Sequence, residues 1–103
     1  MSTVRWSRRA VQDLVELADY IARDDAAAAR SWVERLRERA TLAAAAPRMG
    51  RRVPELGRDD VRETYLRTYR LVYRVDGKGI VVLTVVEGRR RLPRVDPDAQ
   101  GTD

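Results

Sequence analysis

The spacing of hydrophobic and polar positions changes once along the chain. Between residues 8 and 45 apolar side chains recur every three or four positions, and after residue 60 they gather into short, dense runs. The first spacing predicts helices and the second predicts strands. Thr3–Trp6 alternates and predicts a short strand before the helices. We therefore expect an α+β fold of order β-α-α-β-β-β, with an antiparallel helix hairpin packed on a small, mainly antiparallel sheet.

Two helices are predicted in the first half of the chain. Ser7 is a suitable N-cap for a helix that ends near Arg23, and Asp24-Asp25 then caps a second helix over Ala26–Ala45, which Pro47 ends. The first helix carries an apolar stripe of Val11, Leu14, Val15, Ala18 and Ile21. The second carries one of Ala29, Trp32, Val33, Leu36, Ala40 and Ala43. Both stripes are expected to lie in the core.

Three strands are predicted at Val61–Leu66, Tyr69–Val75 and Ile80–Val86, with a glycine-containing turn between the last two. The middle run alternates, so Arg70 and Arg74 should share one side of a sheet whose other side is apolar. We expect this arginine-bearing side to be the functional surface.

The remaining segments show no periodicity. Residues 47–60 are expected to form an exposed connection. We assign residues 1–95 to one domain and residues 96–103 to a flexible tail.

Composition narrows the chemistry. The 103 residues include no cysteine and no histidine, which excludes disulfides, thiolate metal sites and histidine-based acid–base catalysis. No spaced acidic loop indicates a metal, so we expect no cofactor. No run approaches the length of a membrane span or a signal peptide, and we expect a cytoplasmic protein. The net charge of +5 comes almost wholly from arginine, which suits phosphate or carboxylate partners.

Three kinds of function fit this composition. A nuclease would have the cations for phosphate but would need a proton-transfer group, and its candidates are Glu63, Glu87 and the tyrosines. A nucleic-acid binder could use the basic cluster at residues 89–94, although no aromatic platform is evident on the arginine side. A protein binder could use that side, an open sheet edge or a helix groove.

Several short motifs occur in an order and spacing that together indicate a family resemblance. They are V-x-W-S-x-x-A at Val4–Ala10, Y-I-A at Tyr20–Ala22, Val61-Arg62-Glu63, Y-R-L-V-Y-R-V at Tyr69–Val75 and G-R-R at Gly88–Arg90. Together they resemble the ParE/RelE superfamily of bacterial type II toxins. The resemblance implies a toxin that is neutralised in a complex with a cognate antitoxin protein. RelE-type members cut mRNA on the ribosome, and ParE-type members inhibit DNA gyrase.

The chain matches the catalytic residues of the RelE-type nucleases only in part. Arg70 and Arg90 match arginines of that type, and Arg62 aligns approximately with a lysine. The catalytic tyrosine is not matched, because Leu92–Asp98 contains no tyrosine. The resemblance therefore favours a ParE-like gyrase inhibitor, which is not an enzyme, over the alternative of a RelE-like mRNA endonuclease acting on ribosome and mRNA.

The candidate residues follow from this choice. For a target-binding surface we expect Arg62, Arg70, Arg89, Arg90 and Arg91 at one end of the sheet. For the alternative nuclease the catalytic set would be Arg62, Arg70 and Arg90. The antitoxin is expected to cover apolar grooves beside the helix hairpin.

Overall fold

The computed structural model describes residues 3–102. Its helices are α1 (Arg8–Ala22) and α2 (Ala26–Ala45), followed by a 3-10 turn over Pro47–Met49. Its strands are β1 (Thr3–Ser7), β2 (Arg51–Arg52), β3 (Val61–Leu66), β4 (Tyr69–Asp76), β5 (Gly79–Glu87) and β6 (Gly101–Thr102). The predicted α+β class and the predicted order of the main elements are confirmed.

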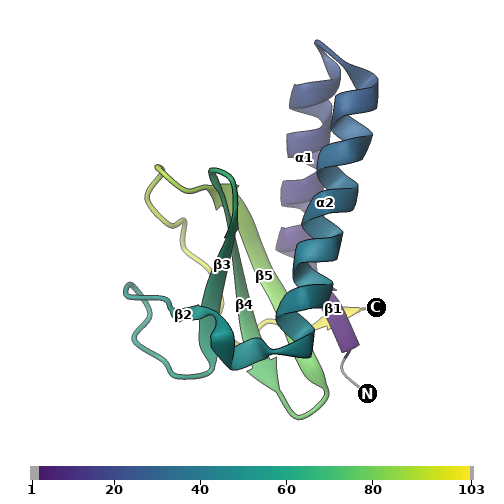
Figure 1. Cartoon of the computed structure of the whole chain (residues 1–103). Coiled ribbons are helices and arrows are strands. Elements are labelled where there is room, and N and C mark those ends of the chain that lie inside the picture. Colours follow the sequence, from purple (N-terminus) through teal and green to yellow (C-terminus); the bar gives the residue numbers. More distant parts are fainter. Residues whose placement is uncertain (1–2, 103) are drawn as a thin grey trace.

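The six strands form one sheet in the order β2-β3-β4-β5-β1-β6. Among the strands of residues 3–102, only the β1–β5 pair is parallel, because the helix hairpin lies between β1 and the rest of the sheet. The hairpin stands against one face of the sheet and extends beyond its end (Figure 1). Neither helix in residues 3–102 is long and apolar enough to cross a membrane.

Both helices begin as the sequence predicts. The side-chain oxygens of Ser7 and Asp25 accept hydrogen bonds from the backbone N–H groups of Ala10 and Ala28. Each bond satisfies a helix N-terminal donor that would otherwise lack a partner.

The main core lies between the helices and the sheet. Leu14, Leu36, Leu71, Tyr73 and Ile80 are among its buried members. Trp32 packs on its margin and meets Tyr69 edge to face, with ring centroids 5.2 Å apart. The predicted stripe of α1 is only partly buried, because Val11 and Val15 remain 46% and 54% exposed. These two valines point beside the hairpin rather than into it, so the expectation that the whole stripe is core was wrong.

A second apolar cluster covers the other face of the sheet. It contains Val53, Val61, Val72, Val81 and Leu83. Val53 belongs to the segment expected to be an exposed connection, yet its side chain is fully buried. The side expected to display arginines is therefore a second core layer.

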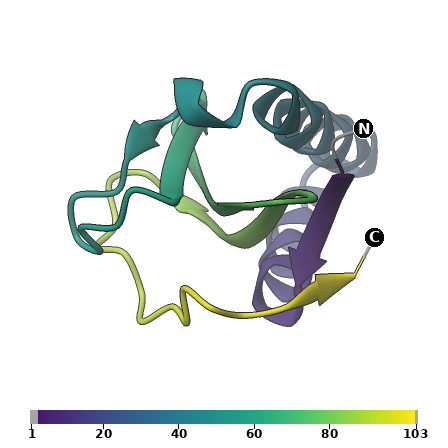
Figure 2. The ribbon, with the colours of Figure 1, turned by 90° about the horizontal axis from the view of Figure 1, so that it is seen from below.

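The C-terminal segment closes this second layer. Leu92, Val95 and Ala99 pack against it, and Arg74 donates hydrogen bonds to the carbonyls of Pro97 and Ala99 at 2.7 and 2.8 Å. The segment runs along the side of the sheet away from α2 and ends beside β1 (Figure 2). There Gly101 and Thr102 pair with Ser7 and Trp6. Residues 96–102, expected as a flexible tail, thus lie along the sheet because apolar side chains and a strand edge hold them.

Candidate target-binding surface

Arg70 lies on the second face of the sheet and is 4% exposed. Its Nε donates to Glu63, and its two Nη atoms donate to Glu55 at 2.9 and 2.8 Å. These bonds raise the pKa of Arg70 and hold the pKa of Glu55 at about 2. All three guanidinium nitrogens already have carboxylate partners, so Arg70 has no free edge to offer a phosphate.

Glu63 explains why this cluster is internal. Its side chain is fully buried and receives hydrogen bonds from Arg70 and from Nε and Nη2 of Arg51, the Nε bond measuring 2.8 Å. A buried carboxylate that is left unpaired is costly, so both arginines serve to compensate its charge. The hydrogen bond and charge of Glu63 also raise the pKa of Arg51.

Arg62 lies on the opposite face from Arg70, because neighbouring positions of β3 alternate between the faces. Its guanidinium donates to the backbone carbonyl and carboxylate of Asp59, both at 2.8 Å, and to the carbonyl of Gly50 at 3.1 Å. Arg62 therefore ties β3 to the loops beside it. The structure does not bring Arg62 and Arg70 together.

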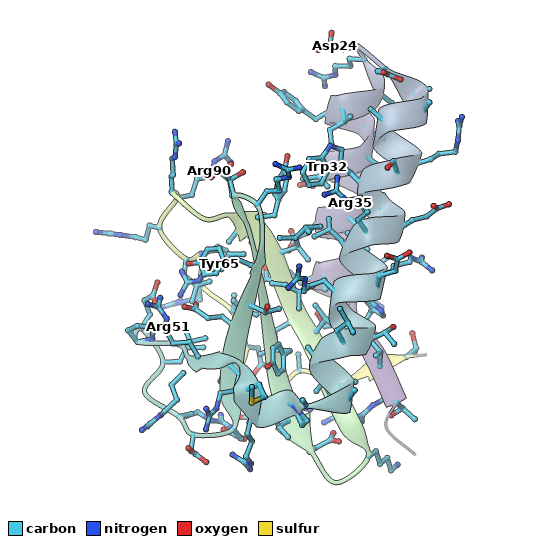
Figure 3. The ribbon with its side chains drawn as sticks, in the orientation of Figure 1. Asp24, Trp32, Arg35, Arg51, Tyr65 and Arg90 are labelled. Atoms are coloured by element: carbon cyan, nitrogen blue, oxygen red, sulfur yellow. The ribbon has the colours of Figure 1, made fainter. Side chains whose placement is uncertain are left out.

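Arg89, Arg90 and Arg91 follow β5 and are all exposed. Arg90 lies at the upper end of the sheet in Figure 3. The adjoining turn after β3 contributes Arg67, which is also exposed and has a positive φ of 55°. The N–H of Gly88 donates to the carbonyl of Thr68, so the two turns are fastened side by side. We call Arg67, Arg89, Arg90 and Arg91 the basic tip.

The sequence analysis did not identify two residues of this surface, Arg67 and Tyr65. Arg67 was not identified because the contact between its turn and Gly88 joins residues about twenty positions apart. Tyr65 was read as one of several tyrosines, and no aromatic platform was expected on the arginine side. That expectation was wrong: Tyr65 pairs with Arg70 across the strands, so it lies on the same face, and it is 40% exposed. The alternation of β3 was the available signal.

Of the proton-transfer candidates, Glu87 and Tyr69 lie beside the exposed Arg90 and Arg91, in a pocket of about 610 Å³. The Oε1 atom of Glu87 accepts a hydrogen bond from the backbone N–H of Arg89 at 3.2 Å. Neither Arg62 nor Arg70 is among the residues that line this pocket.

Glu63 and Glu55 are paired with Arg70, on the second face. Tyr73 lies in the main core, where burial raises the pKa of its phenol, and its hydroxyl donates to the carbonyl of Pro47 at 2.7 Å. Burial likewise raises the pKa of Tyr69. In residues 3–102 no group of three or more acidic side chains is placed to hold a metal ion.

A separate apolar groove follows the outer side of the helix hairpin. Its volume is about 350 Å³, and its walls include Trp6, Val11, Val15, Ala18 and Val33. Further toward the helix–helix turn, small side chains of both helices continue an apolar surface. Charged side chains of both signs border it: Asp19, Arg30, Glu34 and Arg37. The groove and the basic tip belong to different parts of the molecule, so they can serve different partners.

Comparison with known proteins identifies the family. A solved structure described as the chromosomal ParDE TA system from P. aeruginosa matches with a TM-score of 0.69 and 24% identity, over 84% of this chain and 96% of that chain. At this identity the likeness shows a shared fold. No individually curated protein matches the chain. The family model described as the ParE toxin of the type II toxin–antitoxin system, parDE, matches residues 4–92. Since that match covers most of the sequence, the chain belongs to the ParE toxin family of type II toxin–antitoxin systems.

Proposed function

We propose that this toxin acts by binding DNA gyrase in the cytoplasm and that the basic tip is part of the binding surface. The observation that carries the proposal is the division of the arginines. Arg70 and Arg62 are bound to neighbouring groups of the same chain, whereas Arg89, Arg90 and Arg91 are exposed. Exposed guanidinium groups favour association with an acidic or phosphate-bearing surface.

The same division argues against the RelE-like alternative. A nuclease of that type would need Arg62, Arg70 and Arg90 around one nucleotide. Here Arg70 and Arg62 lie on opposite faces of the sheet, and Arg70 is closed off by two carboxylates. Glu55, whose pKa is about 2, is far from the proton affinity that a general base needs near neutral pH.

We further propose that the antitoxin covers the groove beside the helix hairpin. Val11 and Val15 expose apolar surface there, and Trp6 and Val33 complete an apolar wall. An amphipathic helix binds such a groove through side chains spaced three and four residues apart. Charged side chains of both signs border the adjoining surface, Arg30 and Arg37 together with Asp19 and Glu34, so the rim of that helix would carry complementary charges of both signs. The toxin and its antitoxin would then form a hetero-oligomer.

The test compares two double variants that lose the same charge. Arg89→Ala with Arg90→Ala removes half of the basic tip, and Arg23→Ala with Arg30→Ala removes two exposed arginines of the helix hairpin. Each purified variant is titrated into a supercoiling assay with gyrase from the matched species. We expect the first to lose at least tenfold in inhibition and the second to stay within twofold of the parent chain.

Two results would contradict the proposal. One is a parent chain that leaves gyrase untouched at excess concentration. The other is equal inhibition by the two double variants. Cleavage of mRNA on programmed ribosomes by the parent chain would instead support the RelE-like alternative.

A further inference from the structure

Half of strand β3 has no neighbour on its outer side. β2 pairs with β3 only at Arg51↔Glu63 and Arg52↔Arg62, so Thr64, Tyr65 and Leu66 continue beyond the end of β2. No other strand within residues 3–102 lies on that side. This short stretch is an open sheet edge, which is a template for pairing with an extended segment of another chain.

The backbone groups at this edge can be assigned from the ladder. The carbonyl of Val61 accepts a hydrogen bond from the N–H of Val53, which lies on the outer side of β3. Residues two apart present their backbone groups to the same side. The N–H and C=O of Tyr65 therefore point outward, away from β4.

On the helix side, two of the most exposed apolar side chains border the edge. Leu42 is 64% exposed and Met49 is 86% exposed. Together with Arg39, Thr64 and Tyr73 they line a shallow pocket of about 180 Å³. Such exposure of large apolar side chains beside an unpaired strand is typical of an interaction site.

On the other face, the edge leads into the basic tip. The ring of Tyr65 lies against Gly88, where an added Cβ would come within 2.8 Å of the ring carbon Cε2. Arg51 is on the same face, and its side chain is 67% exposed although it is paired with Glu63. Tyr65 and Arg51 both lie on the part of the sheet away from the helices (Figure 3). The ring of Tyr65 thus connects the open edge to Arg89 and its neighbours.

We propose that Thr64–Leu66 receives an extended, acidic segment of the toxin's protein target, which adds to the sheet as a strand. Side chains of the added strand alternate between the two faces. On the helix side an apolar residue would enter the pocket between Leu42 and Met49. On the opposite side an acidic residue would approach Arg51 and the basic tip. This inference rests on the proposed function, because it names how the target meets the same end of the molecule.

The first experiment changes the pocket without disturbing the core. Leu42→Glu and Met49→Glu introduce an acid at exposed positions, so the fold should be retained, and circular dichroism checks this. Ala27→Glu is the matched control, since it adds the same charge at an exposed apolar position near the start of α2, outside the pocket beside β3 and the groove proposed for the antitoxin. We expect Met49→Glu to need at least tenfold more protein for half-inhibition of gyrase, and Ala27→Glu to stay within twofold.

The second experiment tests strand pairing itself. Tyr65→Pro removes the N–H that points away from β4. Proline is tolerated in an edge strand at a position whose N–H is not bonded to the neighbouring strand. Tyr65→Ala removes the ring and keeps the N–H. We expect the proline variant to inhibit gyrase at least fivefold more weakly than the alanine variant, with melting temperatures of the two compared as a check of folding.

The outcomes separate this inference from the proposed function. Gyrase inhibition by Met49→Glu and Leu42→Glu at the parent level would overturn the edge as a docking site while leaving gyrase as the target. A parent chain that does not inhibit gyrase would overturn the gyrase proposal. In that case growth arrest on expression without antitoxin replaces the gyrase assay, and unchanged arrest by both glutamate variants would overturn the docking site for any target.

Discussion

Arg70 offers the sharpest test, because the structure assigns it a structural role where the resemblance to nucleases suggested a catalytic one. The perturbation is Arg70→Met, which keeps an unbranched apolar stem of similar reach and removes the charge. It withdraws the hydrogen bonds that Arg70 gives to Glu63 and to Glu55. Glu63, whose side chain is fully buried, would keep only Arg51, which is largely exposed.

The size of the effect follows from burial. Removing one partner of a buried ion pair typically costs about 3–5 kcal/mol, and the surviving bond to Arg51 places this case near the lower value, about 3 kcal/mol. Against a total stability on the order of 5–15 kcal/mol, this is a large fraction. For a domain of this size it corresponds to a fall in melting temperature of roughly 12–24 °C. Arg90→Ala, at an exposed position, should change stability by no more than about 0.5 kcal/mol.

Urea unfolding followed by circular dichroism measures both variants. The double variant Arg70→Met with Glu63→Met closes the cycle, because removing both charges leaves no buried carboxylate without a partner. We expect the double variant to be more stable than Arg70→Met alone. The reasoning is refuted if Arg70→Met unfolds within about 1 kcal/mol of the parent chain. A loss of toxicity in a destabilised Arg70 variant would say nothing about catalysis, because the protein would be partly unfolded. A loss of toxicity in a folded Arg90 variant would show that the basic tip contributes to target binding.

Three further changes test other parts of the structure. Gly101→Val should detach β6 from β1, because a Cβ at Gly101 would lie 2.9 Å from backbone atoms of Trp6. We expect the free energy of unfolding to fall by about 1–2 kcal/mol and amide exchange in β1 to become faster. Unchanged exchange would contradict the pairing of β1 with β6. The hydrogen bonds from Arg70 lower the pKa of Glu55 from 4.5 to about 2, so the contribution of Glu55 to folding stability is complete above pH 4.5 and is lost as the pH falls through 2. Because Glu55 is partly exposed, this contribution amounts to at most about 1 kcal/mol. Glu55→Gln should therefore flatten this part of the acid-unfolding curve. Asp13→Ala should cost about 2 kcal/mol in urea unfolding, since the carboxylate accepts two hydrogen bonds from β5, and a change below 0.5 kcal/mol would show that α1 is held otherwise.

The sequence predicted those elements whose pattern is local. Both helices carry a cap and a repeated apolar stripe, and β3, β4 and β5 are dense apolar runs, so their positions were confirmed to within a residue or two. The turn at Arg67 also formed between the expected strands, although it contains neither glycine nor asparagine. These features depend on residues close together in the chain.

The second layer of the sheet could not be predicted in the same way. Val53, Val95 and Ala99 are isolated apolar residues in segments without periodicity, and only the folded chain brings them to one surface. Glu55 and Arg70 are fifteen positions apart and meet for the same reason. The alternation of apolar and polar residues along β4 correctly placed Arg70 on the second face of the sheet, but it carried no information about which residues cover that face.

The arginines considered for the binding surface therefore fall into two groups that composition cannot distinguish. One group compensates buried or loop carboxylates: Arg70 and Arg51 hold Glu63, and Arg62 holds Asp59. The other group is exposed in turns at one end of the sheet, where a backbone hydrogen bond from Gly88 fixes two turns together. Placement of the second group on turns that are fastened to a rigid sheet limits the entropy lost when a partner binds. For the proposed binding of gyrase, this arrangement would add specificity, because the arginines are already held beside an open strand edge and an apolar pocket.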